Sequence, residues 1–256
     1  MNTREHIVAI IPARYGATRL PGKPLIDLAG KSMVQRVYDR ARRAKTIHKV
    51  VVATDDRRIV EAVEAFGGEA SMTPSKLQSG SDRIAHVAKD FPEATIIVNV
   101  QGDEPLIEPQ MIDQAVQLLV DNPKLEVGTL VKKIASKLEI ENPNIVKVVL
   151  DEQGFALYFS RSPIPHRRDG EGNPTFYKHI GLYVYRKDFL QKFSKWPESE
   201  LEQTEKLEQL RILVHGVRIK TGVTEFDSIP IDTPADADRV RKIFSSKEPA
   251  NIGARK

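Results

Sequence analysis

The chain has 256 residues, a formal net charge of +4 and no cysteine, which excludes disulfides, thiolate zinc sites and cysteine nucleophiles. Its 40% hydrophobic and 29% charged content is enough for one large α/β core, while mixed charge signs and only 6% aromatic residues disfavour a nucleic-acid-binding face. The chain shows no signal-peptide pattern and no apolar run long enough for a bilayer. We therefore expect a cytoplasmic protein with no membrane insertion.

The first half alternates short apolar runs with amphipathic segments. Apolar runs predict strands at 7–11, 49–53 and 95–100. Apolar residues at helical spacing predict helices around Met33–Ala41 and Ile59–Phe66. This alternation is typical of a mostly parallel, Rossmann-like sheet with helices on both faces and right-handed crossovers.

The loop after the first predicted strand carries three cations. Arg14, Arg19 and Lys23 follow a buried strand, and open α/β sheets bind ligands at the carboxyl ends of their strands. Guanidinium and ammonium groups suit phosphate oxygens, while Gly16 and Gly22 let the backbone approach closely. We therefore favour a polyphosphate site over a solvated basic loop.

This loop is not an ordinary P-loop. Five residues separate Gly16 from Gly22, where a P-loop has four, and Pro24 stands where its magnesium-binding hydroxyl is required. Gly-x-Gly-x-x-Gly is also absent after the strand, which weakens a nicotinamide or flavin hypothesis.

A serine-rich segment precedes another predicted helix. Ser79 or Ser81 would cap it, and Gly80 would let backbone groups reach the edge of a base. Arg83 would either face a nucleotide or form an ion pair. A simple capped helix start explains the serines but leaves Gln78 unexplained.

Carboxylates follow the third predicted strand. Asp103 would lie in the same crevice as the cations and would suit a hard cation such as Mg²⁺, although a turn aspartate that bonds its own backbone is the alternative. We rank Glu104 lower, because the adjacent Pro105 suggests a turn that points it elsewhere.

A further carboxylate, Asp232, stands just before a predicted helix. Thr233 is the expected N-cap and Pro234 the first helical residue, which leaves Asp232 available for another role. The alternative is that Asp232 only stabilises the positive end of the helix dipole.

The second half follows a different pattern. Strand-like runs at 145–150, 155–159 and 179–185 lack long intervening helices and predict an antiparallel lobe at about 142–225. Apolar residues between Leu201 and Val214 predict one amphipathic helix. We expect a single domain over 1–245, a mobile loop within 166–174 and a flexible tail over 246–256.

Several segments, in this order along nearly the whole chain, resemble the 3-deoxy-manno-octulosonate cytidylyltransferase (CMP-Kdo synthetase) family. They are Pro12–Leu25 (PARYGATRLPGKPL), Val52–Asp56 (VATDD), Gln78–Arg83 (QSGSDR), Val98–Pro105 (VNVQGDEP), Ala156–Arg161 (ALYFSR), Lys206–Arg211 (KLEQLR) and Ile231–Pro234 (IDTP). The resemblance implies a nucleotide-diphospho-sugar transferase-like fold. It also implies transfer of CMP from CTP to Kdo or its 8-amino variant, for lipopolysaccharide synthesis, and a homodimer.

The same resemblance assigns roles to particular residues. Those implied to bind CTP are Arg14, Arg19, Lys23, Gln78, Ser79, Gly80, Arg83 and Gln101. Those implied to bind the sugar acid are Arg161, His179, Tyr183, Glu208 and Gln209. Asp103 and Asp232 are implied to hold Mg²⁺, and with Arg14 and Lys23 they form the implied catalytic set.

Two alternatives stay open. A CMP-sialic acid synthetase is a related possibility, but that family typically has Gly-Gly-Ser-Lys-Arg in its first loop, where this chain reads Ala17-Thr-Arg-Leu-Pro-Gly-Lys-Pro24. A non-catalytic, CTP-binding regulatory relative is the other. The residues from Ser199 to Glu202 depart from the Thr-Pro or Ser-Pro that many family members have there, which bears on the sugar side.

Overall fold

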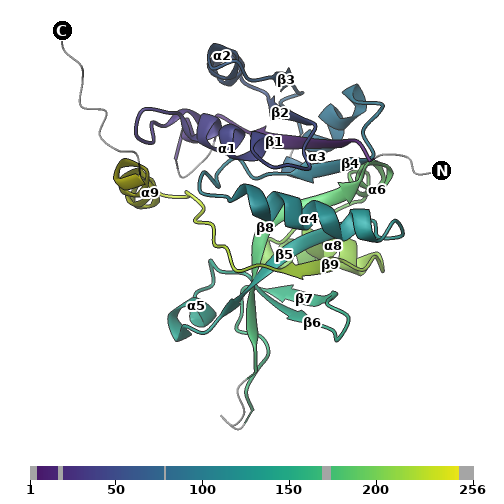
Figure 1. Ribbon diagram of the computed structural model, residues 1–256. Helices are drawn as coiled ribbons and strands as arrows, with labels where there is room; N and C mark the ends of the chain where they lie inside the picture. The colour runs from purple at the N-terminus through teal and green to yellow at the C-terminus, as the bar shows by residue number, and fades with distance from the viewer. Residues whose placement is uncertain (1–4, 17–19, 78, 169–173, 248–256) are drawn as a thin grey trace.

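The computed structural model describes residues 5–16, 20–77, 79–168 and 174–247. Within them, the strands join in one nine-stranded sheet of order β3-β2-β1-β4-β8-β5-β9, with β6 paired to β8 and β7 paired to β6 (Figure 1). The strands are β1 (Ile7–Ala13), β2 (Lys49–Thr54), β3 (Ala70–Met72), β4 (Ile96–Asn99), β5 (Val127–Ile134), β6 (Lys147–Leu150), β7 (Ala156–Ser160), β8 (Phe176–Arg186) and β9 (Lys220–Val223).

Helices cover both faces of this sheet, as the sequence predicts. They are α1 (Met33–Arg42), α2 (Arg57–Ala65), α3 (Gly80–Val87), α4 (Pro109–Asp121), α5 (Lys137–Glu141), α6 (Lys187–Phe193), α7 (Glu200–Glu205), α8 (Gln209–Val214) and α9 (Pro234–Lys247). Apolar residues of α1, α2 and α4 pack on one face, and those of α3, α6 and α8 pack on the other. Both cores therefore hold the strand ends in fixed positions.

The parallel half follows directly from the apolar runs. In β1, Ile7, Ala9 and Ile11 face one core, while Val8 and Ile10 face the other. A strand buried on both sides needs this near-continuous apolar sequence. Both neighbours of β1 in the sheet, β2 and β4, run parallel to it, so their carboxyl ends meet at one edge of the sheet.

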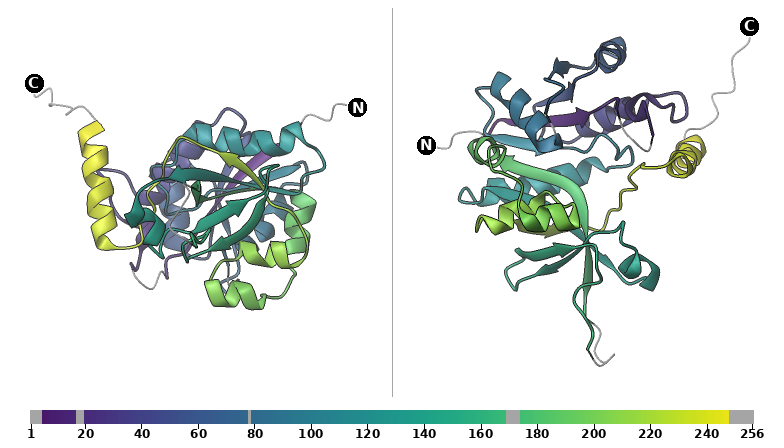
Figure 2. Two further views of the ribbon diagram at one scale, coloured as in Figure 1. Left: turned by 90° about the horizontal axis from the view of Figure 1, so that it is seen from below. Right: turned by 180° about the vertical axis from the view of Figure 1, so that it is seen from behind.

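The second half is antiparallel around β8, which pairs with β4, β5 and β6. The predicted lobe is less separate than expected, because β8 lies inside the main sheet and β9 runs parallel to β5. Figures 1 and 2 show β6, β7, α5 and the beginning of β8 extending away from the parallel half.

The single helix predicted between Leu201 and Val214 is wrong. Lys206 adopts the left-handed conformation, with φ of 53°, and separates α7 from α8. Leu207 is buried between the two short helices. The apolar spacing misled because Leu201 is 41% exposed and Glu202 is the buried residue of α7.

Helix α9 begins as predicted, since the backbone N–H of Asp236 donates to Thr233 Oγ1 at 3.2 Å. It packs through Val240 and Phe244 against Leu28 and Met33, and it lies to one side of the sheet in Figure 2. The helix continues to Lys247 and so takes in the first two residues of the predicted tail. The rest of that tail, and 169–173 of the predicted mobile loop, lie outside the described residues. No helix in the described part is long and apolar enough to cross a membrane.

A close backbone contact joins β1 to the loop after β4. A Cβ atom at Gly102 would lie 2.5 Å from the carbonyl oxygen of Pro12, far inside van der Waals contact. Only glycine lets the loop pass this close to the end of β1. The contact sets the distance between the two loops at this edge of the sheet.

We expect Gly102→Ala to lower the free energy of unfolding by about 1–3 kcal/mol, because the added methyl group forces the two loops apart. Urea denaturation measures this change. Gly16→Ala is the matched control, since a Cβ there meets nothing within 4 Å. Equal stability of the two variants would contradict the close-contact explanation.

Candidate active site

One ammonium group lies between two carboxylates at the carboxyl edge of the sheet. Lys23 Nζ is 2.8 Å from Asp103 Oδ2 and 3.0 Å from Asp232 Oδ1. The three residues come from the turn after β1, the loop after β4 and the segment before α9. The structure thus brings together three of the four residues predicted to be catalytic.

Local backbone contacts produce this convergence. The Gly22 N–H donates to the Tyr15 carbonyl at 3.0 Å, and its left-handed φ of 69° turns the chain so that Lys23 points back to β1. The Ile231 N–H donates to the Asp103 carbonyl at 2.9 Å, and the Ile231 side chain is fully buried. These anchors place Asp232 beside Asp103.

The charges of this group favour cations. Burial lowers the pKa of Lys23, but the charges and hydrogen bonds of Asp103 and Asp232 outweigh it, so the pKa is raised and the ammonium stays charged. Two carboxylates around one ammonium leave a net negative charge. A hard cation that prefers oxygen ligands suits this position.

The donor set fits magnesium better than a fully protein-bound metal. The described residues contain no group of three or more His, Cys, Asp or Glu side chains that could hold a metal ion. Mg²⁺ is commonly bound by one or two carboxylates, with waters and substrate phosphates completing its octahedron. Asp103 and Asp232 supply two carboxylates, and the Lys23 ammonium between them shows that the position accepts a cation.

A small cleft of about 160 Å³ opens beside this group. It is lined by Pro12, Ala13, Arg14, Lys23, Pro24, Met33, Gln101, Gly102 and Asp103. The predicted CTP residues Arg14, Lys23 and Gln101 therefore share one cleft. Gly80 adjoins it, because a Cβ at that position would lie 3.6 Å from Pro12 Cγ. Arg19 and Gln78, also predicted to bind CTP, lie outside the described residues.

The start of α3 forms a wall of this region. Ser79 caps the helix by accepting from the Asp82 N–H at 3.0 Å, and the Asp82 side chain accepts from the Ser79 N–H in return. This capping box fixes the backbone of Ser79 and Gly80.

Arg83 does not face a nucleotide in this structure. Its side chain is fully buried, donates to Asp55 Oδ2 at 2.9 Å and contacts Thr73 Oγ1. Asp55 also lies 4.0 Å from Arg14 Nε. Arg83 thus holds Asp55 under the cleft. Asp55 carries no role in the sequence prediction, although it lies in the Val52–Asp56 segment of the family resemblance.

A second group contains four of the residues predicted to bind the sugar acid. Tyr183 pairs in register with Asn99 at the end of β4, which places it close to the loop of Asp103. The rings of His179 and Tyr183 lie 5.2 Å apart, and His179 Nε2 is 3.2 Å from Thr129 Oγ1. Glu208 and Gln209 come from the corner between α7 and α8.

Buried polar atoms in this region lack protein partners. Tyr183 Oη, Glu208 Oε1 and Gln209 Nε2 have no hydrogen-bond partner among the described residues. An unpaired buried polar atom costs free energy, so three of them in residues of one predicted site indicate a polar ligand. Hydroxyl groups of a sugar can satisfy both donors and acceptors of this kind.

Burial also sets the protonation states here. It lowers the pKa of His179 to about 3, and it raises the pKa of Tyr183 well above its ordinary value. Both side chains are therefore neutral near pH 7. They offer hydrogen bonds and ring surface to a ligand, without charge.

Arg161, the remaining predicted sugar residue, is held by backbone carbonyls. Its guanidinium donates to Glu205 O at 2.8 Å and Pro143 O at 3.0 Å. The buried Lys147 donates to the Arg161 carbonyl at 2.5 Å. The structure fixes Arg161 at the end of β7, and its contact with a sugar carboxylate stays a prediction.

Glu104 points elsewhere, as the adjacent Pro105 suggested. The turn points its side chain into the protein beside Gly181, with 7% of the residue exposed. Burial raises its pKa to about 7, with smaller effects from Ser228, Asp103, Asp227 and Lys178. The sequence does not reveal this burial, because the surroundings of the side chain depend on β8, a distant segment.

A larger cleft of about 540 Å³ lies on the other side of Asp232. Its wall includes Glu139, Lys178, Asp227 and Arg239. Lys178 is 2.8 Å from Asp227 Oδ1 and 3.1 Å from Glu139 Oε1, so its charge is balanced within the cleft wall. Sequence reasoning missed this cluster.

Comparison with known proteins agrees with this geometry. A family model described as cytidylyltransferase matches residues 8–219. The 3-deoxy-manno-octulosonate cytidylyltransferase of Geobacter sulfurreducens is 53% identical over 245 residues, covering 92% of this chain and 98% of the relative. That of Chloroherpeton thalassium is 48% identical over 242 residues, covering 94% and 98%.

This chain belongs to the 3-deoxy-manno-octulosonate cytidylyltransferase family. A solved CMP:2-keto-3-deoxy-manno-octonic acid synthetase complexed with CTP superposes with a TM-score of 0.91 at 46% identity, covering 95% of this chain and all of the other. A cytidylyltransferase from Leptospira borgpetersenii, at 19% identity with a TM-score of 0.64, covers 96% of this chain and 89% of the other, and shares the fold. The predicted fold class is thereby confirmed.

The depressed pKa of His179 gives this cytidylyltransferase a specific acid sensitivity. The unfolded state takes up a proton below the ordinary histidine pKa of 6.5, whereas the folded state resists it down to about 3. Stability from this residue is therefore present above pH 6.5 and lost as the pH falls. We expect the free energy of unfolding to fall by up to about 1.4 kcal/mol per pH unit through this residue. The His179→Gln variant should lack this pH-dependent contribution. Urea denaturation between pH 7 and 5 measures it.

His166→Gln is the matched control for that series, because His166 is an exposed histidine. This variant is expected to keep the acid dependence of the unaltered protein. A His179→Gln variant with unchanged acid dependence would show that His179 is not the responsible group.

Proposed function

We propose that this protein transfers CMP from CTP to a 3-deoxy-octulosonic acid and releases pyrophosphate. The observation that carries the proposal is the adjacency of two half-sites. The cationic cleft and carboxylate pair lie at the end of β4, and the pocket with unpaired polar atoms begins at Tyr183, the register partner of Asn99 in that strand. A relative named for this reaction at 53% identity supports the choice of substrates.

The chemistry follows from the two half-sites. The anomeric hydroxyl of the acid attacks the α-phosphorus of CTP and releases its proton to solvent, while the bond to pyrophosphate breaks with its electron pair leaving on the pyrophosphate. Arg14 and Lys23 stabilise the negative charge that develops there, and we propose that Arg19 adds to this. Positioning and charge stabilisation supply most of the acceleration, since no side chain is assigned as a general base.

We propose magnesium as the cofactor, held by Asp103 and Asp232. When bound, it neutralises phosphate charge and lowers the barrier to nucleophilic attack. Lys23, which bridges the two carboxylates in this structure, would contact phosphate oxygens of the bound nucleotide.

The sugar acceptor, the cellular compartment and the oligomeric state are further proposals. Tyr183, Glu208 and Gln209 would bind sugar hydroxyls, while Arg161 would bind the acid group. Kdo is the proposed acceptor, with its 8-amino variant as the close alternative, and the CMP-sugar would supply lipopolysaccharide synthesis. We also propose a cytoplasmic homodimer. Leu138 and Leu157, with 82% and 60% of their surface exposed, offer apolar surface on α5 and β7 for a second copy.

Pyrophosphate release tests the proposal directly. Reactions contain Mg²⁺, CTP and Kdo, 8-amino-Kdo or sialic acid, with UTP and ATP as nucleotide controls. We expect turnover only with CTP and an octulosonate. Turnover with sialic acid alone would identify a CMP-sialic acid synthetase. CTP binding without turnover on any acid would identify a regulatory relative, and either result would refute the proposed function.

A further inference from the structure

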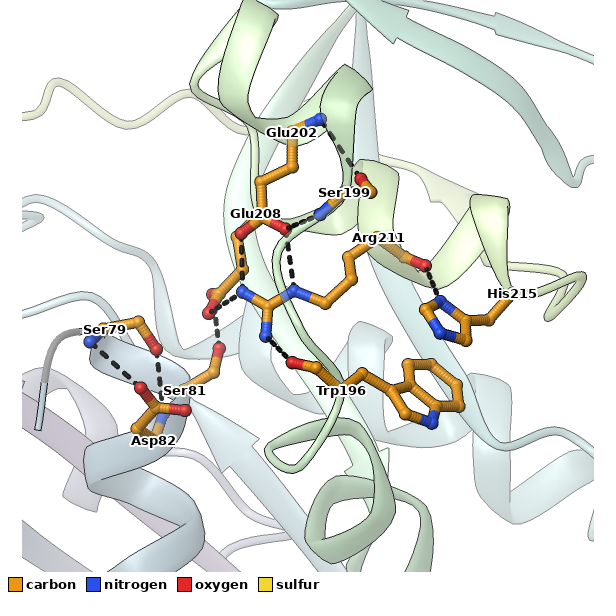
Figure 3. Close-up of polar contacts among 9 residues, drawn as sticks. All are labelled: Ser79, Ser81, Asp82, Trp196, Ser199, Glu202, Glu208, Arg211 and His215. Atoms are coloured by element: carbon orange, nitrogen blue, oxygen red, sulfur yellow. Dashed lines mark hydrogen bonds and ion pairs between the residues drawn. The ribbon is translucent and has the colours of Figure 1, made fainter.

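A buried polar network links the start of α3 to the corner between α7 and α8 (Figure 3). The Ser81 hydroxyl donates to Glu208 Oε2 at 2.5 Å, across 127 residues of sequence. Ser81 is 1% exposed and does not cap its helix, because Ser79 has that role. The hydroxyl of Ser81 is therefore committed to Glu208.

Arg211 holds the same corner from the other side. Its guanidinium donates to both carboxylate oxygens of Glu202, at 2.7 and 2.5 Å, and to the Trp196 carbonyl at 3.0 Å. Glu202 is itself fixed by its capping box with Ser199. A bidentate pair of this kind allows little rotation, so α7 and α8 keep one relative orientation.

Glu208 lies between these two anchors. Its Oε2 accepts from Ser81, while its Oε1 is 3.7 Å from Arg211 Nη2 and has no hydrogen-bond partner among the described residues. One oxygen is thus used to hold the carboxylate in place. The other is left to accept a hydrogen bond from a ligand hydroxyl.

The location of Ser81 gives this contact a second consequence. Gly80, the adjacent residue, adjoins the wall of the nucleotide cleft at Pro12, and the capping box of Ser79 and Asp82 fixes the backbone there. The Ser81–Glu208 hydrogen bond is a direct polar link between this wall and the acceptor pocket.

We propose that Ser81 is a positioning residue for the acceptor: its hydroxyl orients Glu208 toward the sugar and couples acceptor binding to the nucleotide-binding helix. This inference rests on the proposed function. Ser81 contacts neither substrate in this scheme and acts only through Glu208. Arg211 and Glu202 form the rigid support against which Ser81 holds the carboxylate.

Ser81→Ala tests the proposal in steady-state kinetics and in binding by calorimetry. We expect KM for the octulosonate to rise about tenfold, which corresponds to about 1.4 kcal/mol. The Kd of CTP alone should stay within about twofold, and kcat should change less than KM. In a Glu208→Gln background, adding Ser81→Ala should change KM by less than about twofold, because the two residues act as one unit.

Thr46→Val is the matched control. The Thr46 hydroxyl also donates to a carboxylate, Asp113 Oδ1 at 2.8 Å, but it lies outside both half-sites. It should lose stability comparable to Ser81→Ala and keep the unaltered KM. An unchanged octulosonate KM in Ser81→Ala, or an equal effect of Ser81→Ala in both backgrounds, would overturn the inference alone. A wild-type protein that neither binds nor converts an octulosonate would overturn the proposed function as well.

Discussion

The bridge from Lys23 to Asp103 and Asp232 is the interaction on which the site depends. It joins segments separated by 80 and 209 residues, and it places one ammonium between two carboxylates. Leaving two partly buried carboxylates together without a cation would be costly, so the bridge stabilises their relative position. The Gly102 contact with Pro12 and the hydrogen bond from Ile231 to Asp103 fix the positions of the segments that the bridge joins.

The sheet explains why the two half-sites are neighbours. Parallel β1, β2 and β4 bring their loops to one edge, which supplies the nucleotide cleft. The antiparallel insertion of β8 next to β4 then places Tyr183 beside Asn99. Because β8 also pairs with β5, Thr129 Oγ1 lies 3.2 Å from His179 Nε2. One long strand thus carries the acceptor pocket to the end of the nucleotide-binding half.

Sequence reasoning reached the fold class because its signals are local. The apolar run of β1, the caps at Ser79 and Thr233 and the turn glycine before Lys23 each act over a few residues. It failed where distant segments decide the outcome. The burial of Arg83 depends on Asp55 and Thr73, the surroundings of the Glu104 carboxyl depend on β8, and Lys206 breaks a helix that the apolar spacing predicted as continuous. The family resemblance named Glu208, but only the fold shows that Ser81 holds it.

The central claim is that Asp103 and Asp232 hold a divalent cation beside Lys23. Mn²⁺ binding in the presence of CTP, followed by electron paramagnetic resonance, tests it most directly. We expect Asp103→Asn and Asp232→Asn each to weaken Mn²⁺ binding by at least about tenfold. Asp227→Asn, a carboxylate in the neighbouring cleft, should leave binding unchanged. Wild-type affinity in both Asp103→Asn and Asp232→Asn would contradict the assignment of the cation site.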